Sequence, residues 1–219
     1  EFQKYLQFTF YKQWNKLKAY VNSLGIRMIG DIPIYVAMDS ADAWANPSLF
    51  QLDEKNVPYA VAGCPPDGFS ATGQLWGNPL YRWEYHRQTG YEWWLQRLSH
   101  CFKLYDAVRI DHFRGFDQYY SIPYGAETAI TGHWEQGPGI DLFNRVRQVL
   151  GEKEVIAEDL GYVTDSVRKL VHDSGFPGMK VLEFAFDSRD SGCASDYLPH
   201  NYPENSVAYT GTHDNETLA

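Results

Sequence analysis

The sequence predicts an α/β fold with parallel strands, and two observations carry this prediction. Short apolar runs typical of buried strands alternate along the chain with segments that have the period of amphipathic helices. The 219 residues are 44% hydrophobic, as in an ordinary globular protein with a buried core. Parallel strands joined by helical crossovers give this alternation, and it fits both a closed barrel and an open, doubly wound sheet.

The N-terminal part of the chain, residues 1–35, is expected to form one helix and one strand. Apolar residues recur with a helical period over residues 8–23, and Gly25 is typical of the position that follows a helix. Residues 26–32 are mostly apolar and precede Pro33, which indicates a short buried strand.

Residues 36–90 interrupt the alternation, because they are rich in Pro, Gly, Asn and Asp and contain no long periodic run. A loop-rich insertion of this length inside a compact domain is usually functional. Its aromatic residues, Trp44, Trp76 and Tyr81 among them, argue against disorder, since disordered segments contain few aromatics. We expect this insertion to form part of a substrate groove.

Residues 91–219 return to the alternation of helices and strands. The periodicity predicts helices over residues 91–104, 142–150 and 166–172, and strands over residues 107–111, 154–158, 181–184 and 206–210. A Gly-rich loop is expected after the first of these strands.

Charge and motif content exclude several kinds of partner. The net charge of −9 argues against a nucleic-acid partner, and the absence of an 18-residue apolar run argues against a membrane-spanning helix. No strand is followed by a Gly-rich nucleotide motif. Cys64, Cys101 and Cys193 have no zinc-ligand spacing. We therefore expect no metal and no cofactor, and a cytoplasmic location with reduced thiols.

Three predicted strands end at or near an acidic residue: Asp111, Glu158 and Asp214. Because alternate side chains along a strand share a face, Arg109 and Asp111 should point the same way. Such charges on a buried face cost free energy unless they are paired or functional. A single acid of this kind is more often a helix cap or an ion-pair partner. Three acids, with Arg109 and His213 beside them, favour an active site at the strand ends.

Two carboxylates that flank one bond are what glycosidic chemistry requires. One attacks or stabilises an oxocarbenium-like centre, and the other protonates the leaving oxygen. The proton donor needs a raised pKa, which burial and nearby negative charge provide. A guanidinium such as that of Arg109 would keep the nucleophile ionised.

Six segments resemble the amylomaltase family of 4-α-glucanotransferases (glycoside hydrolase family 77), which is allied to the α-amylase clan. They occur in the family's order at residues 30–36 (GDIPIYV), 72–81 (TGQLWGNPLY), 109–115 (RIDHFRG), 156–161 (IAEDLG), 177–182 (PGMKVL) and 209–217 (YTGTHDNET). This resemblance covers essentially the whole chain. It implies a partial (β/α)8 barrel, about strands three to seven, with the loop-rich insertion after the first strand. Gly68 departs from the pattern, because many relatives have a bulkier residue there.

The resemblance also implies roles for the three acids. Asp111 would be the nucleophile that forms a covalent β-glucosyl-enzyme. Glu158 would act first as the acid and then as the base. Asp214 would bind sugar hydroxyls and stabilise the transition state.

Five further residues are implied to bind substrate. Arg109 and His213 match residues beside the bound glucose. Asp31 either supports this site or is purely structural. Trp76 and Asn78 match a loop that folds over the acceptor side, where the indole would stack on a sugar ring or only anchor the loop.

The implied function is transfer of an α-1,4-glucan segment to the 4-hydroxyl of another glucan or of glucose. The expected ligands are therefore α-1,4-glucans, maltooligosaccharides and glucose. Residue patterns alone do not separate this transferase from an α-retaining hydrolase of the same clan or from a non-catalytic glucan-binding module. The family is about twice as long as this chain, so we expect an internal segment that alone is poorly active or self-associates.

Overall fold

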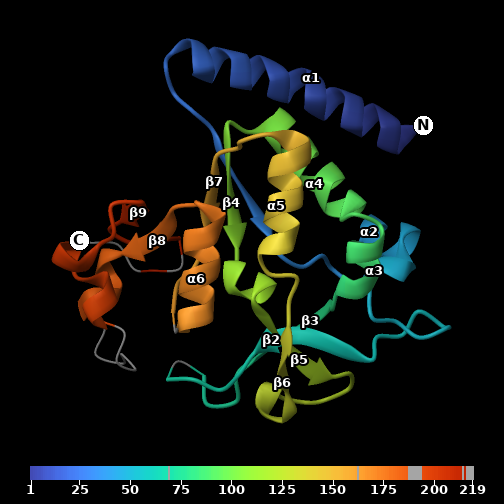
Figure 1. Ribbon diagram of the computed structural model, residues 1–219. Helices are drawn as coiled ribbons and strands as arrows, with labels where there is room; N and C mark the ends of the chain where they lie inside the picture. The colour runs from blue at the N-terminus through green and yellow to red at the C-terminus, as the bar shows by residue number, and fades with distance from the viewer. Residues whose placement is uncertain (69, 162, 187–193, 214, 216–219) are drawn as a thin grey trace.

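The computed structural model describes residues 1–68, 70–161, 163–186, 194–213 and 215 of the chain. Its five parallel strands form one sheet in the order β1-β4-β7-β8-β9 (Figure 1). In chain order these are β1 (Ile29–Pro33), β4 (Ala107–Asp111), β7 (Val155–Ala157), β8 (Gly178–Val181) and β9 (Ser206–Tyr209). The predicted α/β fold with a parallel sheet is therefore confirmed.

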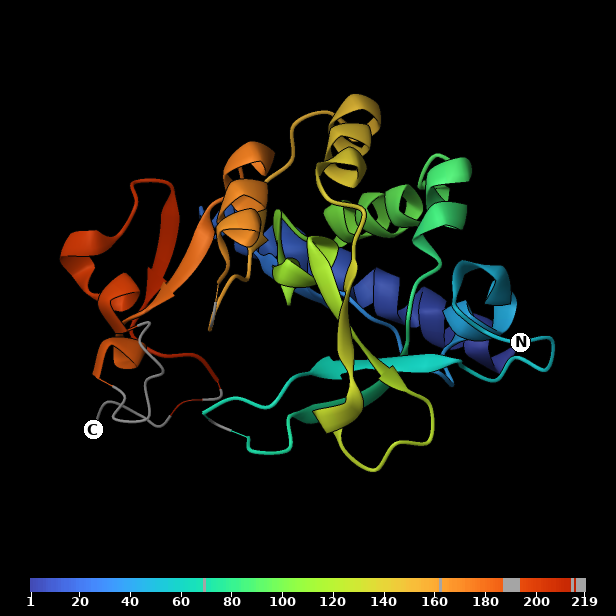
Figure 2. The same ribbon diagram turned by 60° about the horizontal axis from the view of Figure 1, so that its bottom comes forward.

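Helices between the parallel strands cover one face of this sheet (Figures 1 and 2). The longer ones are α4 (Glu92–Leu104), α5 (Ile140–Leu150) and α6 (Asp165–Ser174). A further helix, α1 (Phe2–Ser23), precedes β1 and packs against α4. On α4, the buried residues Trp94, Leu98 and Cys101 recur every three or four positions, so one stripe of the helix faces the core. The amphipathic pattern therefore determines which side of each helix packs on the sheet.

Strand alternation divides β1 and β4 between the two faces of the sheet. Gly30, Ile32, Val108 and Ile110 are buried on the helix side. Gly30 permits close packing there, because a Cβ at this position would lie 2.0 Å from the ring of Tyr105. The intervening residues of both strands point to the opposite face and are more exposed. This opposite face carries the polar side chains.

A second, antiparallel sheet corrects the expectation of a loop over residues 36–90 and of a Gly-rich loop after residue 111. Its strands lie in the order β3-β2-β5-β6. They are β2 (Ala60–Cys64), β3 (Gln74–Pro79), β5 (Gln118–Pro123) and β6 (His133–Gln136). These strands are short, β2 and β3 pair with an irregular register, and β2 pairs with β5 about sixty residues later. Local periodicity does not reveal such pairing.

Short helices occupy much of the remaining chain. They are α2 (Ala41–Ala45), α3 (Trp83–Gln88) and the 3-10 turns η1 (Pro47–Leu49), η2 (Phe113–Phe116), η3 (Ala129–Thr131), η4 (Leu182–Phe186), η5 (Ala194–Tyr197) and η6 (Pro199–Asn201). The strand expected over residues 181–184 is thus largely the turn η4, and β8 precedes it. Within the described part of the chain, no helix has both the length and the apolarity to cross a membrane.

Strand β4 is directed toward the antiparallel sheet. In Figure 1 it runs downward and is followed by η2 and then by β5 in the lower sheet. The C-terminal end of β4 therefore borders the antiparallel sheet, and the predicted acids Asp111 and Glu158 lie at the ends of β4 and β7.

Candidate active site

Arg109 joins two acids on the polar face of the parallel sheet. Its Nη1 lies 2.6 Å from Oδ2 of Asp31, and its Nη2 lies 2.8 Å from Oδ1 of Asp111. Asp31 is the register partner of Arg109 on the adjacent strand, and Asp111 lies two residues further along β4. The guanidinium is 17% exposed, whereas the two carboxylates are 51% and 44% exposed. The prediction that Arg109 and Asp111 share a face is confirmed.

Glu158 lies in a different environment, directly after β7. Its Oε2 accepts a hydrogen bond from the backbone N–H of His112 at 2.7 Å, and its Oε1 accepts one from that of Leu160 at 2.9 Å. Burial raises the pKa of Glu158 to about 7. The negative charge of Asp111 adds to this rise, whereas the two N–H groups and Arg109 oppose it. A carboxyl with this pKa exchanges its proton readily near neutral pH.

Backbone pairing brings the two acids together. Ile110 on β4 is the register partner of Ala157 on β7, so Asp111 and Glu158 leave neighbouring parallel strands at the same edge. The N–H of Glu158 donates to the carbonyl of Ile110 at 3.0 Å, and the N–H of Phe113 donates to the carbonyl of Glu158 at 2.9 Å. Both acids are therefore held at fixed positions by strand geometry.

A hollow of about 250 Å³ opens beside these residues. Asp31, Pro33, Arg109, Asp111 and His213 line it. The structure thus brings four of the predicted site residues to one place, from β1, β4 and the segment that follows β9. The predicted acid Asp214 lies outside the described residues.

A compact turn carries His213. The side-chain oxygen of Asn215 accepts hydrogen bonds from the backbone N–H of Thr212 at 2.8 Å and from its hydroxyl at 2.9 Å. Asn215 was not among the site residues predicted from the sequence. Its position one residue after an implied catalytic acid was the available signal.

Trp76 and Asn78 are tied to the protein by their own contacts. The indole of Trp76 packs edge-to-face on the ring of His112, with centroids 4.8 Å apart, and its N–H donates to Gln74 at 2.9 Å. The amide of Asn78 donates to the carbonyl of Val36 at 2.8 Å. Both residues therefore anchor their segment to the rest of the protein. Stacking of Trp76 on a sugar ring stays a prediction.

Asp159 points away from this group of acids. Its Oδ1 accepts a hydrogen bond from the N–H of Met179 on β8 at 2.8 Å. A Cβ at Gly178 would lie 2.7 Å from its other oxygen, so glycine is required there. This contact with the neighbouring strand β8 indicates a structural role for Asp159.

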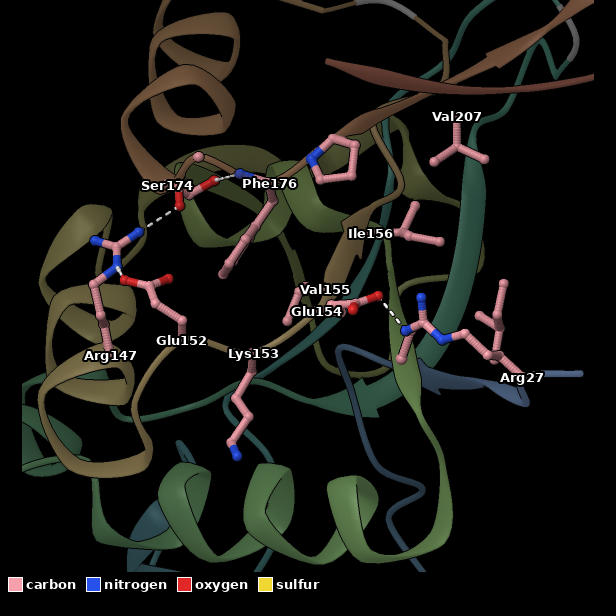
Figure 3. A pocket seen from close by; sticks show the side chains of 14 residues that line it. Arg27, Arg147, Glu152, Lys153, Glu154, Val155, Ile156, Ser174, Phe176 and Val207 are labelled. Carbon is pink, nitrogen blue, oxygen red and sulfur yellow. Dashed lines mark hydrogen bonds and ion pairs between the residues drawn. The ribbon is translucent and has the colours of Figure 1, made fainter. Parts of the chain in front are cut away.

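A larger hollow lies at the other ends of the parallel strands, beside the first residues of β1, β4 and β7. Four of its charged residues form two ion pairs, as Figure 3 shows. Arg27 pairs with Glu154, and Arg147 pairs with Glu152 at 2.9 Å and donates to the carbonyl of Ser174 at 2.7 Å. These acids are solvated ion-pair partners, which distinguishes them from Glu158.

Within the described residues, no cluster of three or more His, Cys, Asp or Glu side chains could hold a metal ion.

Comparisons with known proteins show the family to which the chain belongs. The model of the family described as 4-alpha-glucanotransferase (glycoside hydrolase family 77) matches residues 1–219. A 4-alpha-glucanotransferase of Clostridium butyricum is 53% identical over 98% of the chain, which spans 44% of that relative. One from Streptococcus pneumoniae serotype 4 is 55% identical over 99% of the chain and 42% of its own length.

A solved structure has the same fold. The amylomaltase of Streptococcus agalactiae, solved in complex with acarbose, superimposes with a TM-score of 0.92 at 48% identity over 97% of the chain and 42% of its own. The chain thus spans about two fifths of the length of these relatives. From its sequence match and its fold, this chain belongs to the 4-alpha-glucanotransferase family.

Proposed function

We propose that the natural protein carrying this chain is a 4-α-glucanotransferase acting on α-1,4-glucans and maltooligosaccharides, with glucose as an acceptor. The observation that carries the proposal is the pairing of two unlike carboxyls on adjacent strands. Asp111 is salt-bridged to Arg109, and Glu158 is a partly buried acid whose pKa is raised by desolvation to about 7. Retaining glycosidic chemistry requires this combination.

In the first step, Asp111 attacks the anomeric carbon of the donor and forms a covalent β-glucosyl ester. Arg109 keeps the attacking carboxylate ionised. Glu158 gives its proton to the glycosidic oxygen, so the leaving segment departs as a neutral alcohol. In the second step, ionised Glu158 takes the proton from the acceptor 4-hydroxyl, whose oxygen displaces Asp111. The anomeric configuration is retained.

The remaining residues would hold the sugars. Arg109, Asp31 and His213 line the hollow beside Asp111, where the donor glucose would lie. Asp214 would bind its hydroxyls and stabilise the transition state, and Trp76 and Asn78 would border the acceptor. A relative at 48% identity was solved with acarbose, which supports a carbohydrate ligand for the same fold.

The proposed architecture is part of a (β/α)8 barrel, about strands three to seven, whose strand ends carry the acids. In this organisation residues 1–35 and 91–219 belong to the barrel, and residues 36–90 form part of the groove. We further propose a cytoplasmic location, where the free thiols of Cys64 and Cys101 would stay reduced.

Transfer would prevail over hydrolysis if a bound acceptor competes better than water for the covalent intermediate. An acceptor held in place has a large effective concentration, and exclusion of water increases its advantage. Trp76 is positioned to contribute, because its ring is fixed on His112, the residue after Asp111.

Incubation of the natural protein with maltotriose tests the proposal. Formation of both longer and shorter oligosaccharides supports a transferase, whereas net production of reducing ends indicates a hydrolase. Trapping with an activated fluoro-sugar and mapping the adduct by mass spectrometry should label Asp111. A label on another residue, or binding without turnover, would refute the proposal.

A further inference from the structure

His112 has an unusual backbone conformation directly beside the acid. Its φ is 54°, and only Asn56 and Tyr91 share a positive φ among the described residues other than glycine. A left-handed conformation is uncommon for residues other than glycine, although histidine adopts it more often than most. At His112 it turns the chain after β4, and the backbone N–H of the residue donates to Oε2 of Glu158 at 2.7 Å. A residue with an uncommon backbone conformation therefore provides one of the two N–H groups that hold the acid.

The ring of His112 makes a second contact, with the opposite side of the site. It packs edge-to-face on Trp76, with centroids 4.8 Å apart. Its Nε2 is buried and makes no hydrogen bond within the described structure. Burial and the positive charge of Arg114 lower the pKa of His112 to about 3, so the ring is neutral at physiological pH. It acts through packing and carries no proton in the reaction.

We infer that His112 is a positioning residue that links the two halves of the site, holding the carboxyl of Glu158 through its backbone and the indole of Trp76 through its ring. This inference rests on the proposed function for its consequence in catalysis. The contacts themselves are independent of that function, so they can be tested separately.

Several groups besides His112 influence the pKa of Glu158, and a substitution at His112 should leave their contributions in place. Asp111 and Arg109 face it from β4, Cys64 from β2, and the N–H of Leu160 binds its other oxygen. A neutral substitution at His112 leaves all of these unchanged. Loss of its N–H contact should therefore raise the pKa of Glu158 by about one unit, since each backbone N–H favours the ionised form by about that amount.

Two variants separate the backbone contact from the ring contact. His112→Val disfavours the left-handed conformation, because the side chain is β-branched, and should withdraw the N–H. His112→Asn tolerates that conformation and should keep the N–H while removing the ring. His112→Ala, with a smaller backbone penalty, replaces the Val variant if that variant does not fold.

The matched control is Asn56→Val. Asn56 has the same left-handed backbone, with φ of 60°, in an exposed turn formed by residues 53–57. This control should destabilise the protein by a similar amount without affecting Glu158. Thermal unfolding of each variant measures that shared cost.

The first measurement is a carbon-13 NMR titration of the glutamate carboxyls without substrate, with the Glu158 signal assigned by its absence in Glu158→Gln. The Val or Ala variant should raise the titration midpoint by about one pH unit. The Asn variant and the Asn56→Val control should leave it unchanged. A midpoint unchanged in the Val and Ala variants would overturn the backbone part of the inference.

The second measurement is acceptor kinetics in the natural protein. His112→Asn should raise the KM for the acceptor about two- to tenfold, the effect of losing one aromatic contact, with little change for the donor. An unchanged acceptor KM would overturn the ring part. Failure of the wild type to disproportionate maltotriose would instead refute the proposed function, and the NMR result would still decide whether His112 positions Glu158.

Discussion

Asp111 and Glu158 end neighbouring strands, yet the protein surrounds them with different groups. Asp111 is almost half exposed and lies against the guanidinium of Arg109. Glu158 is held by two backbone N–H groups and has a pKa raised to about 7 by burial. A full positive charge beside one acid and desolvation of the other should keep the first ionised and the second protonated.

This difference shows how two carboxyl groups of one site can be given different protonation behaviour, as the proposed roles of nucleophile and proton donor require. Strand register places the two acids side by side, so their positions in the sheet do not distinguish them. The groups that surround each acid make them different. Substituting one of these neighbours or one of the two acids therefore tests the comparison.

The largest effect is expected for Asp111→Asn. The amide cannot form the glycosyl ester, so kcat should fall by about 10⁴-fold or more, as when the essential residue of other covalent enzymes is removed. The matched control is Asp173→Asn on the exposed surface of α6. Turnover rates on maltotriose and the absence of a trapped adduct measure the effect. Retention of a tenth of the activity would contradict the role of Asp111 as nucleophile.

Glu158→Gln should lower the rate with maltotriose by about 10²- to 10⁴-fold, the usual contribution of a general acid. A glucosyl fluoride donor has a leaving group that needs little protonation, so its glycosylation step should be affected much less. Single-turnover rates with the two donors provide the measurement. An equal loss with both donors would argue against proton donation by Glu158.

The rate should depend on pH through Glu158. Glucan turnover requires its protonated form, so kcat/KM should fall about tenfold per unit as pH rises above about 7. The folded pKa is raised from an ordinary value of 4.5, so protonation favours the folded state. The resulting stability is fully present below pH 4.5 and is lost as pH rises toward 7.

Urea unfolding tests this linkage. The free energy of unfolding of the wild type should decrease relative to that of Glu158→Gln between pH 4.5 and 7. Parallel curves for the two proteins would show that Glu158 titrates normally.

The smallest effect is expected for Arg109→Lys. A lysine ammonium cannot reach Asp31 and Asp111 with the geometry of a guanidinium fork, so one charge-assisted hydrogen bond should be lost. Activity should fall about tenfold, which corresponds to about 1.5 kcal/mol. Stability should fall by at most about 1 kcal/mol, since both carboxylates are partly solvated. Arg145→Lys on the exposed face of α5 is the control.

Much of the parallel sheet was predictable because its signals are local. The run AVRID predicted a strand at residues 107–111, which are the bounds of β4 in the structure. The alternation of side chains along a strand predicted that Arg109 and Asp111 share a face. The antiparallel sheet was not predictable from local pattern. Pairs such as Ala60 with Pro123 join segments that carry no alternation of their own.

The charged side chains of the candidate site were predictable from the sequence, whereas the backbone groups that bind them were not. The sequence of residues 109–115 does not indicate that the N–H of His112 donates to Glu158. This contact depends on the left-handed backbone conformation of His112, which no glycine marks in the sequence. The side-chain oxygen of Asn215 was missed for a similar reason. It acts on the backbone of its own turn and not on a ligand.

The second sheet also has a consequence for how the chain folds. β1 and β4 pair although 78 residues separate Asp31 from Arg109, and closing such a loop costs about 4 kcal/mol in chain entropy. β2 and β3 form a hairpin inside that interval, so they shorten it before the parallel strands meet. We expect early hairpin formation to accelerate assembly of the parallel sheet, so that weakening β2 slows refolding more than it destabilises the native protein.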